Sequence, residues 1–326
     1  MTLGLVFPGQ GSQSVGMLAG LAPWAGAESV IRDTFAEASA VLGYDLGELV
    51  AGGPAERLNR TECTQPAMLA ASIATWRLWR GGGGAEPEVV CGHSLGEFSA
   101  LVAAGSLDYA AAIDLVRFRG SLMQQAVPAG SGAMAAILGL DDAEVIAACR
   151  EAAQGGIVEA VNFNAPGQVV IAGSREPVER AIEAAKQRGA KRAVALPVSV
   201  PAHSSLMRSA AQHLGERLAA VAFRPPRIRF VSAVDAAAHQ DPEELRQLLV
   251  RQLSSPVQWS ETVRALAAGG VRSLIECGPG KVLTALNRRI DRSLECLALE
   301  DAASLGAALK APQAPSSPQE MFHAGK

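Results

Sequence analysis

Short apolar runs alternate with longer helical patterns over the N-terminal third of the chain. The first run, Leu3–Phe7, has the length of a buried strand and ends at a glycine-rich loop. Apolar positions over Gln65–Trp79 repeat with a helical period, and a run of glycines at 81–84 interrupts the pattern. A second apolar strand, Glu88–Cys91, leads into a helix of small residues that continues through Ala104. This alternation predicts a parallel sheet with helices on both faces.

The order of elements changes between residues 132 and 196. Strand, helix, strand, strand, helix and strand follow one another there, which is the ferredoxin-like β-α-β-β-α-β order. Asp141 and Ser174 are candidate N-caps of the two helices, and Gly189 is a candidate C-cap. The predicted elements are strand Ala133–Leu138, helix Asp141–Ala152, strands Ile157–Asn162 and Gln168–Ala172, helix Arg175–Arg188 and strand Arg192–Leu196.

We therefore expect a larger α/β domain into which a small subdomain is inserted. Residues 1–131 and 197–310 form the larger domain, and residues 132–196 form the ferredoxin-like subdomain. The apolar run Leu196–Ala202, which contains two prolines, is expected to be strand-like. Residues 311–326 are rich in proline, glutamine and serine and are expected to form a disordered tail.

Composition and charge exclude several classes of protein. The net charge is −3 and no long run of one sign occurs, so nucleic-acid binding is not expected. No apolar run approaches the roughly 20 residues that span a bilayer, and the apolar N-terminus lacks a basic flank. We therefore expect a cytoplasmic globular protein. The five cysteines are scattered and never spaced C-x-x-C, which argues against a disulfide framework and a zinc site.

A G-x-S-x-G sequence, Gly92-His93-Ser94-Leu95-Gly96, stands between the second strand and the helix that follows it. In that context the serine lies on a tight turn, clear of the backbone. The N-terminus of the following helix offers free N–H groups and a positive dipole end to an oxyanion. Ser94 is therefore a candidate nucleophile, although the same pattern also occurs in ordinary turns.

A serine hydroxyl needs a base to remove its proton, and the chain has five histidines. His203 is the best candidate because it follows the run Leu196–Ala202 and so stands at the end of an ordered element. Its alternative role is to cap the helix that begins near Ser204. His93 adjoins the serine, but the turn is expected to point its ring away from the hydroxyl. The other histidines stand on an expected exposed helix face, in a polar stretch and in the tail: His213, His239 and His323.

The helix predicted near residues 108–125 carries an arginine on its apolar side. Arg117 has Asp114 within one turn, whereas Arg119 has only apolar neighbours at helical spacing. A guanidinium is costly to bury unless an anion meets it. That anion is either an acid distant in the chain, which is the commoner case, or a ligand carboxylate bound by both guanidinium nitrogens. The apolar neighbours are Leu115, Val116, Leu122 and Met123.

Two glycine-containing loops have different interpretations. The loop at residues 9–11 follows the first strand and lies at the carboxyl edge of the predicted sheet, where α/β proteins bind ligands. It either presents a backbone N–H to the same site as Ser94 or is an ordinary tight turn. The sequence Gly-Pro-Gly-Lys at residues 278–281 lacks the spacing of a phosphate-binding loop, so nucleotide hydrolysis is not expected.

Six short blocks stand in order along the chain: Phe7-Pro8-Gly9-Gln10-Gly11-Ser12-Gln13, Gln65-Pro66-Ala67, Gly92-His93-Ser94-Leu95-Gly96-Glu97, Asn162-Phe163-Asn164-Ala165-Pro166-Gly167-Gln168, Pro197-Val198-Ser199-Val200-Pro201-Ala202-His203 and Gln252-Leu253-Ser254-Ser255-Pro256-Val257-Gln258-Trp259. Together they closely resemble the bacterial malonyl-CoA:acyl carrier protein transacylases of fatty acid synthesis. The resemblance covers the chain from Met1 to about Leu309 and is far more specific than the serine motif alone. The family's fold is an α/β-hydrolase-like core with an inserted ferredoxin-like subdomain, in agreement with the order of elements above.

The resemblance implies a role for each matching position. Ser94 would be the nucleophile, His203 its base and Arg119 the partner of the malonyl carboxylate. The backbone N–H groups of Gln10 and Leu95 would form the oxyanion hole. The reaction would be a ping-pong transfer from malonyl-CoA to the phosphopantetheine thiol of acyl carrier protein, by a monomer that needs neither metal nor cofactor.

Three further positions follow from the same resemblance. Gln252 would orient the base through its backbone carbonyl, so that no acidic third member is expected, and Asn162 and Gln65 would line the pocket. Two departures from the family pattern bear on substrate selectivity rather than on the reaction. Ala202 stands where close relatives often have serine. Residues 231–235 lack the asparagines that the family usually has before the aspartate at position 235.

Acyl carrier proteins of this kind are acidic, so a basic surface is expected to receive them. We place it at the end of the second subdomain helix, although a solvated helix end has the same composition. The basic residues there are Lys186, Arg188, Lys191 and Arg192.

Three alternative functions remain at this stage. A serine thioesterase or hydrolase would share the serine turn, but α/β-hydrolases place an acid and then a late histidine after the serine, whereas more than a hundred residues follow His203. A non-catalytic carrier-binding subunit would not require Ser94 and His203. A stand-alone acyltransferase that loads a polyketide synthase differs only in its carrier protein.

Overall fold

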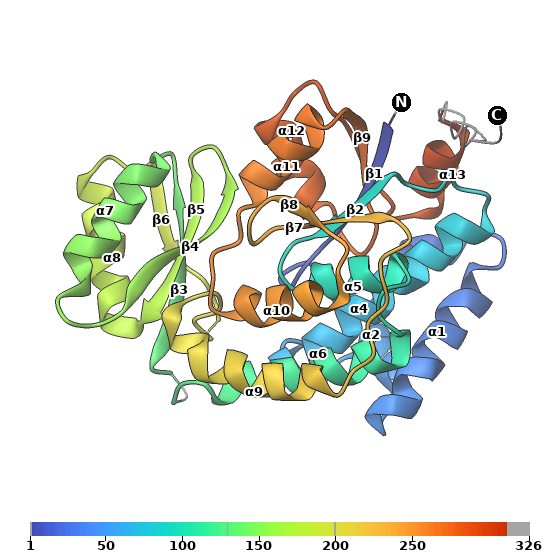
Figure 1. Ribbon diagram of the computed structural model, residues 1–326, viewed down its shortest axis with the longest axis horizontal. Coiled ribbons are helices and arrows are strands. Elements are labelled where there is room, and N and C mark those ends of the chain that lie inside the picture. The colour runs from blue at the N-terminus through green and yellow to red at the C-terminus, as the bar shows by residue number, and fades with distance from the viewer. Residues whose placement is uncertain (1, 129, 199, 312–326) are drawn as a thin grey trace, which may run out of the picture.

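The computed structural model describes residues 2–128, 130–198 and 200–311 and contains two separate sheets. The larger sheet has six strands in the order β10-β9-β1-β2-β7-β8, and the smaller has four in the order β4-β5-β3-β6. Figure 1 shows the smaller sheet with α7 and α8 at one end of the molecule and the larger sheet with the other helices at the opposite end. This arrangement confirms the predicted fold class.

All neighbours in the larger sheet run parallel except β7 and β8. The predicted parallel sheet thus carries one antiparallel strand at its edge, because β8 follows β7 after a short turn and a strand that returns at once can only pair antiparallel. Ala236 in that turn has a φ of +56°. The strands of this sheet are β1 (Thr2–Phe7), β2 (Val89–Gly92), β7 (Arg229–Ser232), β8 (Ala237–His239), β9 (Val271–Glu276) and β10 (Glu295–Ala298).

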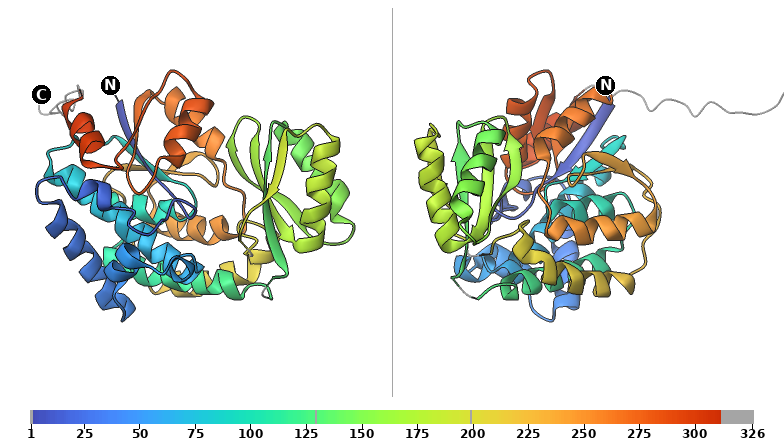
Figure 2. Two further views of the ribbon diagram at one scale, coloured as in Figure 1. Left: turned by 180° about the vertical axis from the view of Figure 1, so that it is seen from behind. Right: turned by 60° about the vertical axis from the view of Figure 1, so that its left-hand side comes forward.

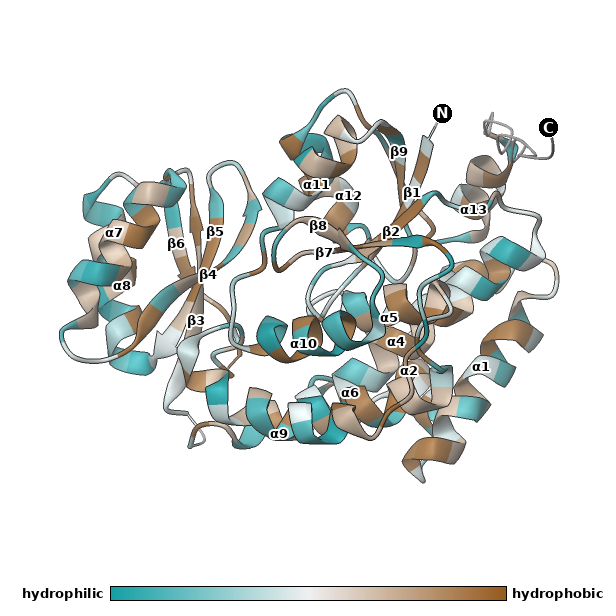
Figure 3. Ribbon diagram, in the orientation of Figure 1, coloured by the Kyte–Doolittle hydropathy of each residue, from teal (hydrophilic) through white to brown (hydrophobic). Residues whose placement is uncertain are grey.

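Alternate residues of β1 enter two cores, one on each face of the larger sheet. Leu5 and Phe7 pack into the core that contains α4, α5 and α6, and Val6 packs with α11 and α12. Figure 3 shows β1 in hydrophobic colours, whereas α9 and α10 alternate between the two colours as amphipathic helices do. The two-sided burial explains why β1 is an uninterrupted apolar run in the sequence.

The helices of the larger unit have these bounds: α1 (Ala27–Leu42), α2 (Leu46–Gly52), α3 (Ala55–Leu58), α4 (Thr61–Gly81), α5 (Gly96–Ala103), α6 (Tyr109–Gln125), α9 (Arg208–Ala219), α10 (Pro242–Leu253), α11 (Trp259–Ala268), α12 (Val282–Ile290) and α13 (Ala302–Lys310), with short 3-10 helices η1 (Ala19–Leu21) and η2 (Ser205–Met207). Within the described ranges, no helix is both long enough and apolar enough to cross a membrane.

The smaller unit has the predicted β-α-β-β-α-β order and an antiparallel sheet. Figure 2 shows its two helices on the outer face of the sheet, away from the larger unit. Ile137, Val145 and Val178 belong to a core of its own beneath these helices. Its elements are β3 (Gly132–Leu138), α7 (Asp142–Ala153), β4 (Val158–Ala165), β5 (Gln168–Ser174), α8 (Arg175–Gln187) and β6 (Arg192–Ala195).

The helix ends of the smaller unit differ from the prediction in detail. Asp141 and Ser174 occupy the N-cap positions, but neither side chain accepts a hydrogen bond from its helix. Acidic residues in the first turns, among them Asp142 and Glu176, interact favourably with the helix dipole instead. Gly189 lies one residue beyond the C-cap and has a φ of +95°, a conformation that suits glycine at that position.

Two segments near the boundary of the units also differ from the prediction. Strand β4 continues to Ala165 with register shifts, and its Phe163 N–H donates to the Val257 carbonyl of the larger unit at 2.9 Å. The described residues of 196–202 do not form the expected strand, because two prolines remove N–H groups that a ladder would need. The tail predicted at 311–326 lies outside the described residues beyond Ala311.

Candidate active site

The turn between β2 and α5 brings three backbone segments unusually close together. A Cβ on Gly96 would lie 2.0 Å from the carbonyl oxygen of Phe7, and a Cβ on Gly92 would lie 2.0 Å from the carbonyl carbon of Gly96. Only glycine therefore fits at either position. Between them Ser94 has a φ of +52°, in the left-handed region that most residues avoid. The turn is the sharp strand-to-helix turn that the motif predicts.

Ser94 precedes the inserted subdomain in the chain and His203 follows it, and the fold brings the two residues together. The Ser94 Oγ lies 2.7 Å from the His203 Nε2, and the His203 Nδ1 lies 2.8 Å from the carbonyl oxygen of Gln252. A carbonyl can only accept, so Nδ1 carries the proton and Nε2 is free to accept from the serine hydroxyl. No acidic side chain is needed to select this tautomer.

Burial keeps the His203 imidazole neutral. The residue is 3% exposed, and burial, assisted by the positive charge of Arg119, lowers its pKa to about 3. Because the pKa is lowered, the ring stays unprotonated as pH falls through the ordinary histidine range near 6.5. The His203 ring is thus in its proton-accepting form at neutral pH.

Arg119 is buried beside the serine without an acidic partner. The residue is 1% exposed, and its Nη2 donates to the Ser94 Oγ at 3.2 Å and to the Gln252 Oε1 at 3.0 Å. Its Nη1 donates to the Met123 sulfur at 3.3 Å, and its Nε has no partner. Among the described residues, no carboxylate lies within ion-pair distance of this guanidinium. Burial lowers the pKa of Arg119 to about 10, opposed by the charge of Glu97, so the group remains a cation at neutral pH.

The Gln252 side chain lies between the arginine and a buried carboxylate. Its Nε2 donates to the Ser94 carbonyl at 2.9 Å and to the Glu97 Oε2 at 2.5 Å. Glu97 is fully buried, and its other oxygen accepts from the Ala233 N–H and the Ser232 hydroxyl. Burial raises the pKa of Glu97 to about 7, and these donors oppose the rise.

Gln65 and Asn162, the predicted pocket residues, are both buried and both have an unpaired oxygen. The Gln65 Nε2 donates to the same Met123 sulfur that Arg119 contacts, at 3.1 Å, so Gln65 adjoins the arginine. Its Oε1 and the Asn162 Oδ1 have no hydrogen-bond partner. The structure therefore brings Gln65 to the site, whereas no contact among the described residues joins the Asn162 side chain to the serine, histidine or arginine.

The two N–H groups predicted for the oxyanion hole are both available. Among the described residues, neither the Gln10 N–H nor the Leu95 N–H has a hydrogen-bond acceptor. Leu95 is the N-cap of α5. A Cβ on Gly9 would lie 2.5 Å from the His93 carbonyl oxygen, so the residue 9–11 loop packs directly on the serine turn. The second loop, at 278–281, packs on Pro8 and Ser72.

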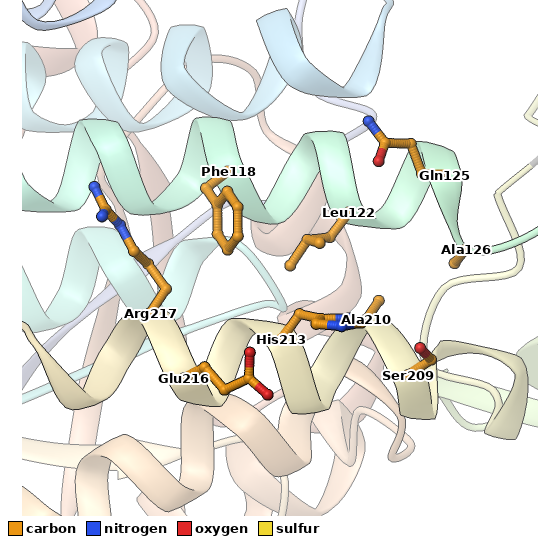
Figure 4. A pocket seen from close by; sticks show the side chains of 9 residues that line it. All are labelled: Phe118, Leu122, Gln125, Ala126, Ser209, Ala210, His213, Glu216 and Arg217. Atoms are coloured by element: carbon orange, nitrogen blue, oxygen red, sulfur yellow. The ribbon is translucent and has the colours of Figure 1, made fainter.

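The ring of His93 points away from the serine hydroxyl, as the sequence indicates. Its Nε2 lies 2.8 Å from the Asn164 Oδ1 of β4, and its ring packs at 5.5 Å on Trp259. Burial lowers the pKa of His93, opposed by the hydrogen bond to Asn164. His213 lies on α9, where it lines an outer groove of about 500 Å³ between α6 and α9. Figure 4 shows that groove, which contains none of the predicted site residues.

The four basic residues predicted to receive the carrier differ in their surroundings. Lys186 forms an ion pair with Glu183, and Arg188 forms ion pairs with Glu144 and Glu151. Lys191 and Arg192 are exposed and have no ion-pair partner among the described residues. Two of the four charges are therefore already balanced within the subdomain.

Sequence reasoning missed Glu97 and the side chain of Gln252. Glu97 stands three residues after Ser94 on a helix whose neighbouring positions are small or apolar, which is the same signal that singled out Arg119. The Gln252 side chain carried no such signal, because a glutamine near the end of an amphipathic helix is ordinarily exposed.

The turn geometry generates a stability prediction. Gly96→Ala places a methyl group against the Phe7 backbone, which cannot move without disturbing β1, so the free energy of unfolding should fall by about 3 kcal/mol. Gly52→Ala is the matched control, because nothing lies within 4 Å of its Cβ. Urea denaturation followed by circular dichroism measures both, and equal losses in the two variants would contradict the account of the turn.

The burial of His203 leads to a prediction about how its protonation depends on pH. The His203 imidazole should remain neutral, with its proton on Nδ1, from pH 7.5 down to 5.5, because its pKa lies well below 6.5. Long-range ¹H–¹⁵N correlation spectra of histidine-labelled protein report this state, and His203→Ala assigns the signal. Titration of that signal with a pKa of 6 or above would show that the ring is not shielded as described.

Known proteins are similar to this chain over almost its whole length. The family model that matches describes an acyl transferase domain and covers residues 5–314. The malonyl CoA-acyl carrier protein transacylase of Escherichia coli K12 is 54% identical over 305 residues, which is 94% of this chain and 98% of the relative. The transacylase of the same name from Bacillus subtilis 168 is 42% identical over 310 residues, 94% of this chain and 96% of the relative.

Solved structures agree in both fold and sequence. An acyl carrier protein S-malonyltransferase from Vibrio cholerae has a TM-score of 0.90 and 56% identity, covering 94% of this chain and 99% of that one. A malonyl-transacylase solved in complex with its type II PKS acyl-carrier protein has a TM-score of 0.93 and 54% identity, covering 95% and 99%. The chain therefore belongs to the malonyl CoA-acyl carrier protein transacylase family of acyl transferase domains.

Proposed function

We propose that this chain transfers the malonyl group of malonyl-CoA to the phosphopantetheine thiol of acyl carrier protein, and so supplies malonyl carrier for fatty acid synthesis. One observation carries the proposal. The guanidinium of Arg119 is buried 3.2 Å from the Ser94 Oγ and has no acidic partner among the described residues. An acyl group attached at that oxygen would meet the cation with its distal carboxylate, which malonyl has and acetyl lacks.

The first half of the cycle forms a malonyl-serine ester. His203 takes the hydroxyl proton at Nε2 as the Ser94 oxygen attacks the thioester carbonyl. The N–H groups of Gln10 and Leu95 stabilise the tetrahedral oxyanion, each lowering the barrier by about 3 kcal/mol. The carbon–sulfur bond then breaks, and the coenzyme A sulfur receives the proton that His203 holds.

The second half reverses these steps with a different thiol. His203 removes the proton of the phosphopantetheine thiol, and the sulfur attacks the malonyl-serine carbonyl. Collapse of the intermediate returns the proton to the Ser94 oxygen and releases malonyl carrier. Each step is an acyl or proton transfer that the named groups can perform, so the proposed cycle includes no metal and no redox cofactor. All of these groups come from one chain, and we propose a monomer as the working state.

Substrate preference tests the role of Arg119. A charge-assisted pair contributes about 1.5–3 kcal/mol in a desolvated site, so Arg119→Ala should lower the malonyl to acetyl ratio of kcat/KM at least about tenfold. Acetyl loading should be little changed or rise. Rates of acyl-serine formation with malonyl-CoA and acetyl-CoA, measured by mass spectrometry of the quenched protein, give the ratio.

Two control variants accompany that measurement. Arg117→Ala removes an exposed arginine of the same helix, which pairs with Asp114, and should leave the ratio unchanged. Ser94→Ala should abolish the adduct with both substrates. Equal loss of both substrates in folded Arg119→Ala would make that arginine a structural residue, and an adduct in Ser94→Ala would remove the serine from its role.

Carrier docking is proposed at the exposed pair Lys191 and Arg192, the two of the four basic residues that have no ion-pair partner within the described ranges. Reversal of both charges to glutamate should raise the KM for acyl carrier protein about fivefold at low salt, because charges at the edge of an interface act mainly on the association rate. The increase should be smaller at high salt, which screens these charges. The same reversal at Arg224 and Arg229 is the matched control. Assays with carriers of fatty acid and polyketide synthesis would show which the surface prefers, and an unchanged KM at low salt would place docking elsewhere.

A further inference from the structure

The end of α10 contacts three residues of the proposed cycle, which are Ser94, His203 and Arg119. The Gln252 carbonyl accepts from His203, while its side chain contacts Arg119 through Oε1 and the Ser94 carbonyl through Nε2. Gln252 is 1% exposed, so water does not compete for these hydrogen bonds. The orientation of one amide group therefore decides what faces the arginine.

Only one orientation of that amide satisfies its neighbours. Arg119 can only donate, so the amide oxygen must face it. On the opposite side the Ser94 carbonyl can only accept, so the amide nitrogen must face it, and in its carboxylate form Glu97 accepts from the same nitrogen. The amide oxygen lies 3.0 Å from the Arg119 Nη2, and the amide nitrogen lies 2.9 Å from the Ser94 carbonyl oxygen and 2.5 Å from the Glu97 Oε2, so both ends of the amide are engaged.

Glu97 is in turn held by groups that only donate to it. The Ala233 N–H donates to Oε1 at 2.6 Å, and the Ser232 hydroxyl donates to the same oxygen at 2.9 Å, while Ser232 itself accepts from the Val234 N–H. In the described part of the chain, the Oε2 of Glu97 accepts from Gln252 alone. The carboxylate thus lies one amide group away from the guanidinium, close enough to offset its charge but not in contact with it.

We propose that Glu97 is a positioning residue that acts through Gln252 to keep the Arg119 guanidinium in place and free for the malonyl carboxylate. The inference rests on the proposed function and adds the means by which the enzyme selects its substrate. An acidic side chain in direct contact with Arg119 would compete with the malonyl carboxylate for the guanidinium. A neutral amide that is hydrogen-bonded to a buried acid does not. Gln252 therefore transmits the orientation and part of the charge, and it occupies the Arg119 Nη2 with a neutral acceptor only.

The isosteric variant Glu97→Gln tests the relay. Its oxygen would remain with Ala233 and Ser232, so its NH₂ would face the NH₂ of Gln252, and two donors repel. The Gln252 amide must turn or move, which removes the acceptor from Arg119. We expect the malonyl to acetyl ratio of kcat/KM to fall at least about tenfold, mainly through a higher KM for malonyl-CoA. Acetyl transfer should change much less.

Glu276→Gln is the matched control. Glu276 is also fully buried and accepts from the Leu283 and Thr284 N–H groups at the start of α12, with no contact to the serine, arginine or Gln252. This variant should lose stability by a similar mechanism yet keep the wild-type ratio. If Glu97→Gln behaves like it, with the ratio unchanged, the proposed relay is wrong.

The exchange Glu97→Gln with Gln252→Glu keeps the total charge and serves if the single variant does not fold. It places a carboxylate directly on Arg119, so the malonyl to acetyl ratio should stay low or fall further. Recovery of the wild-type ratio would overturn the proposal, because charge balance alone would then suffice. If the wild-type enzyme shows no preference for malonyl over acetyl, the proposed function is wrong as well. If that preference is lost in Arg119→Ala but kept in Glu97→Gln, only the relay through Gln252 is wrong.

Discussion

A buried cation that must stay charged and yet remain free is the constraint on which the rest of this site depends. Removing a guanidinium from water costs several kcal/mol unless partners compensate for it. Arg119 obtains weak or neutral partners only: a hydroxyl, an amide oxygen, a sulfur atom and, at 5.8 Å, the ring of Phe98. Its Nε remains unpaired. The incomplete satisfaction leaves binding capacity for a carboxylate, at a cost in the stability of the free protein.

The backbone shows strain at the same place. Ser94 and His203 have φ values of +52° and +65°, and such conformations cost of order 1–3 kcal/mol each for residues other than glycine. The strain persists because surrounding contacts determine both backbones. Gly92 and Gly96 allow the segments around the serine to close, and the His203 N–H donates to the Leu253 carbonyl at 3.1 Å. Leu253 follows Gln252, so the end of α10 contacts His203 through backbone carbonyls and Arg119 through the Gln252 side chain.

The order of elements could be predicted because local signals mark it, whereas contacts between distant segments could not. Glycines and apolar periodicity located β1, α4 and β2, although α4 begins at Thr61, before the predicted Gln65, and Arg119 was identified from the absence of a local acid. The failures have long-range causes. β4 extends past its predicted end because it bonds to Val257, almost a hundred residues later in the chain. The Gln252 amide has a defined role only because Glu97 and Arg119 lie on either side of it.

The position of the inserted subdomain explains why these distant contacts converge. Its two connections to the core follow α6, which carries Arg119, and precede His203. A third connection is the bonding of β4 to Val257, five residues after Gln252. A fourth is the hydrogen bond between His93, which adjoins Ser94, and Asn164 of β4. The two chain connections adjoin α6 and His203, and the two links from β4 enter the core close to Gln252 and Ser94. The small sheet is therefore part of the frame that sets the geometry of the site, and a change in its packing on the core would alter the serine, the base and the arginine together.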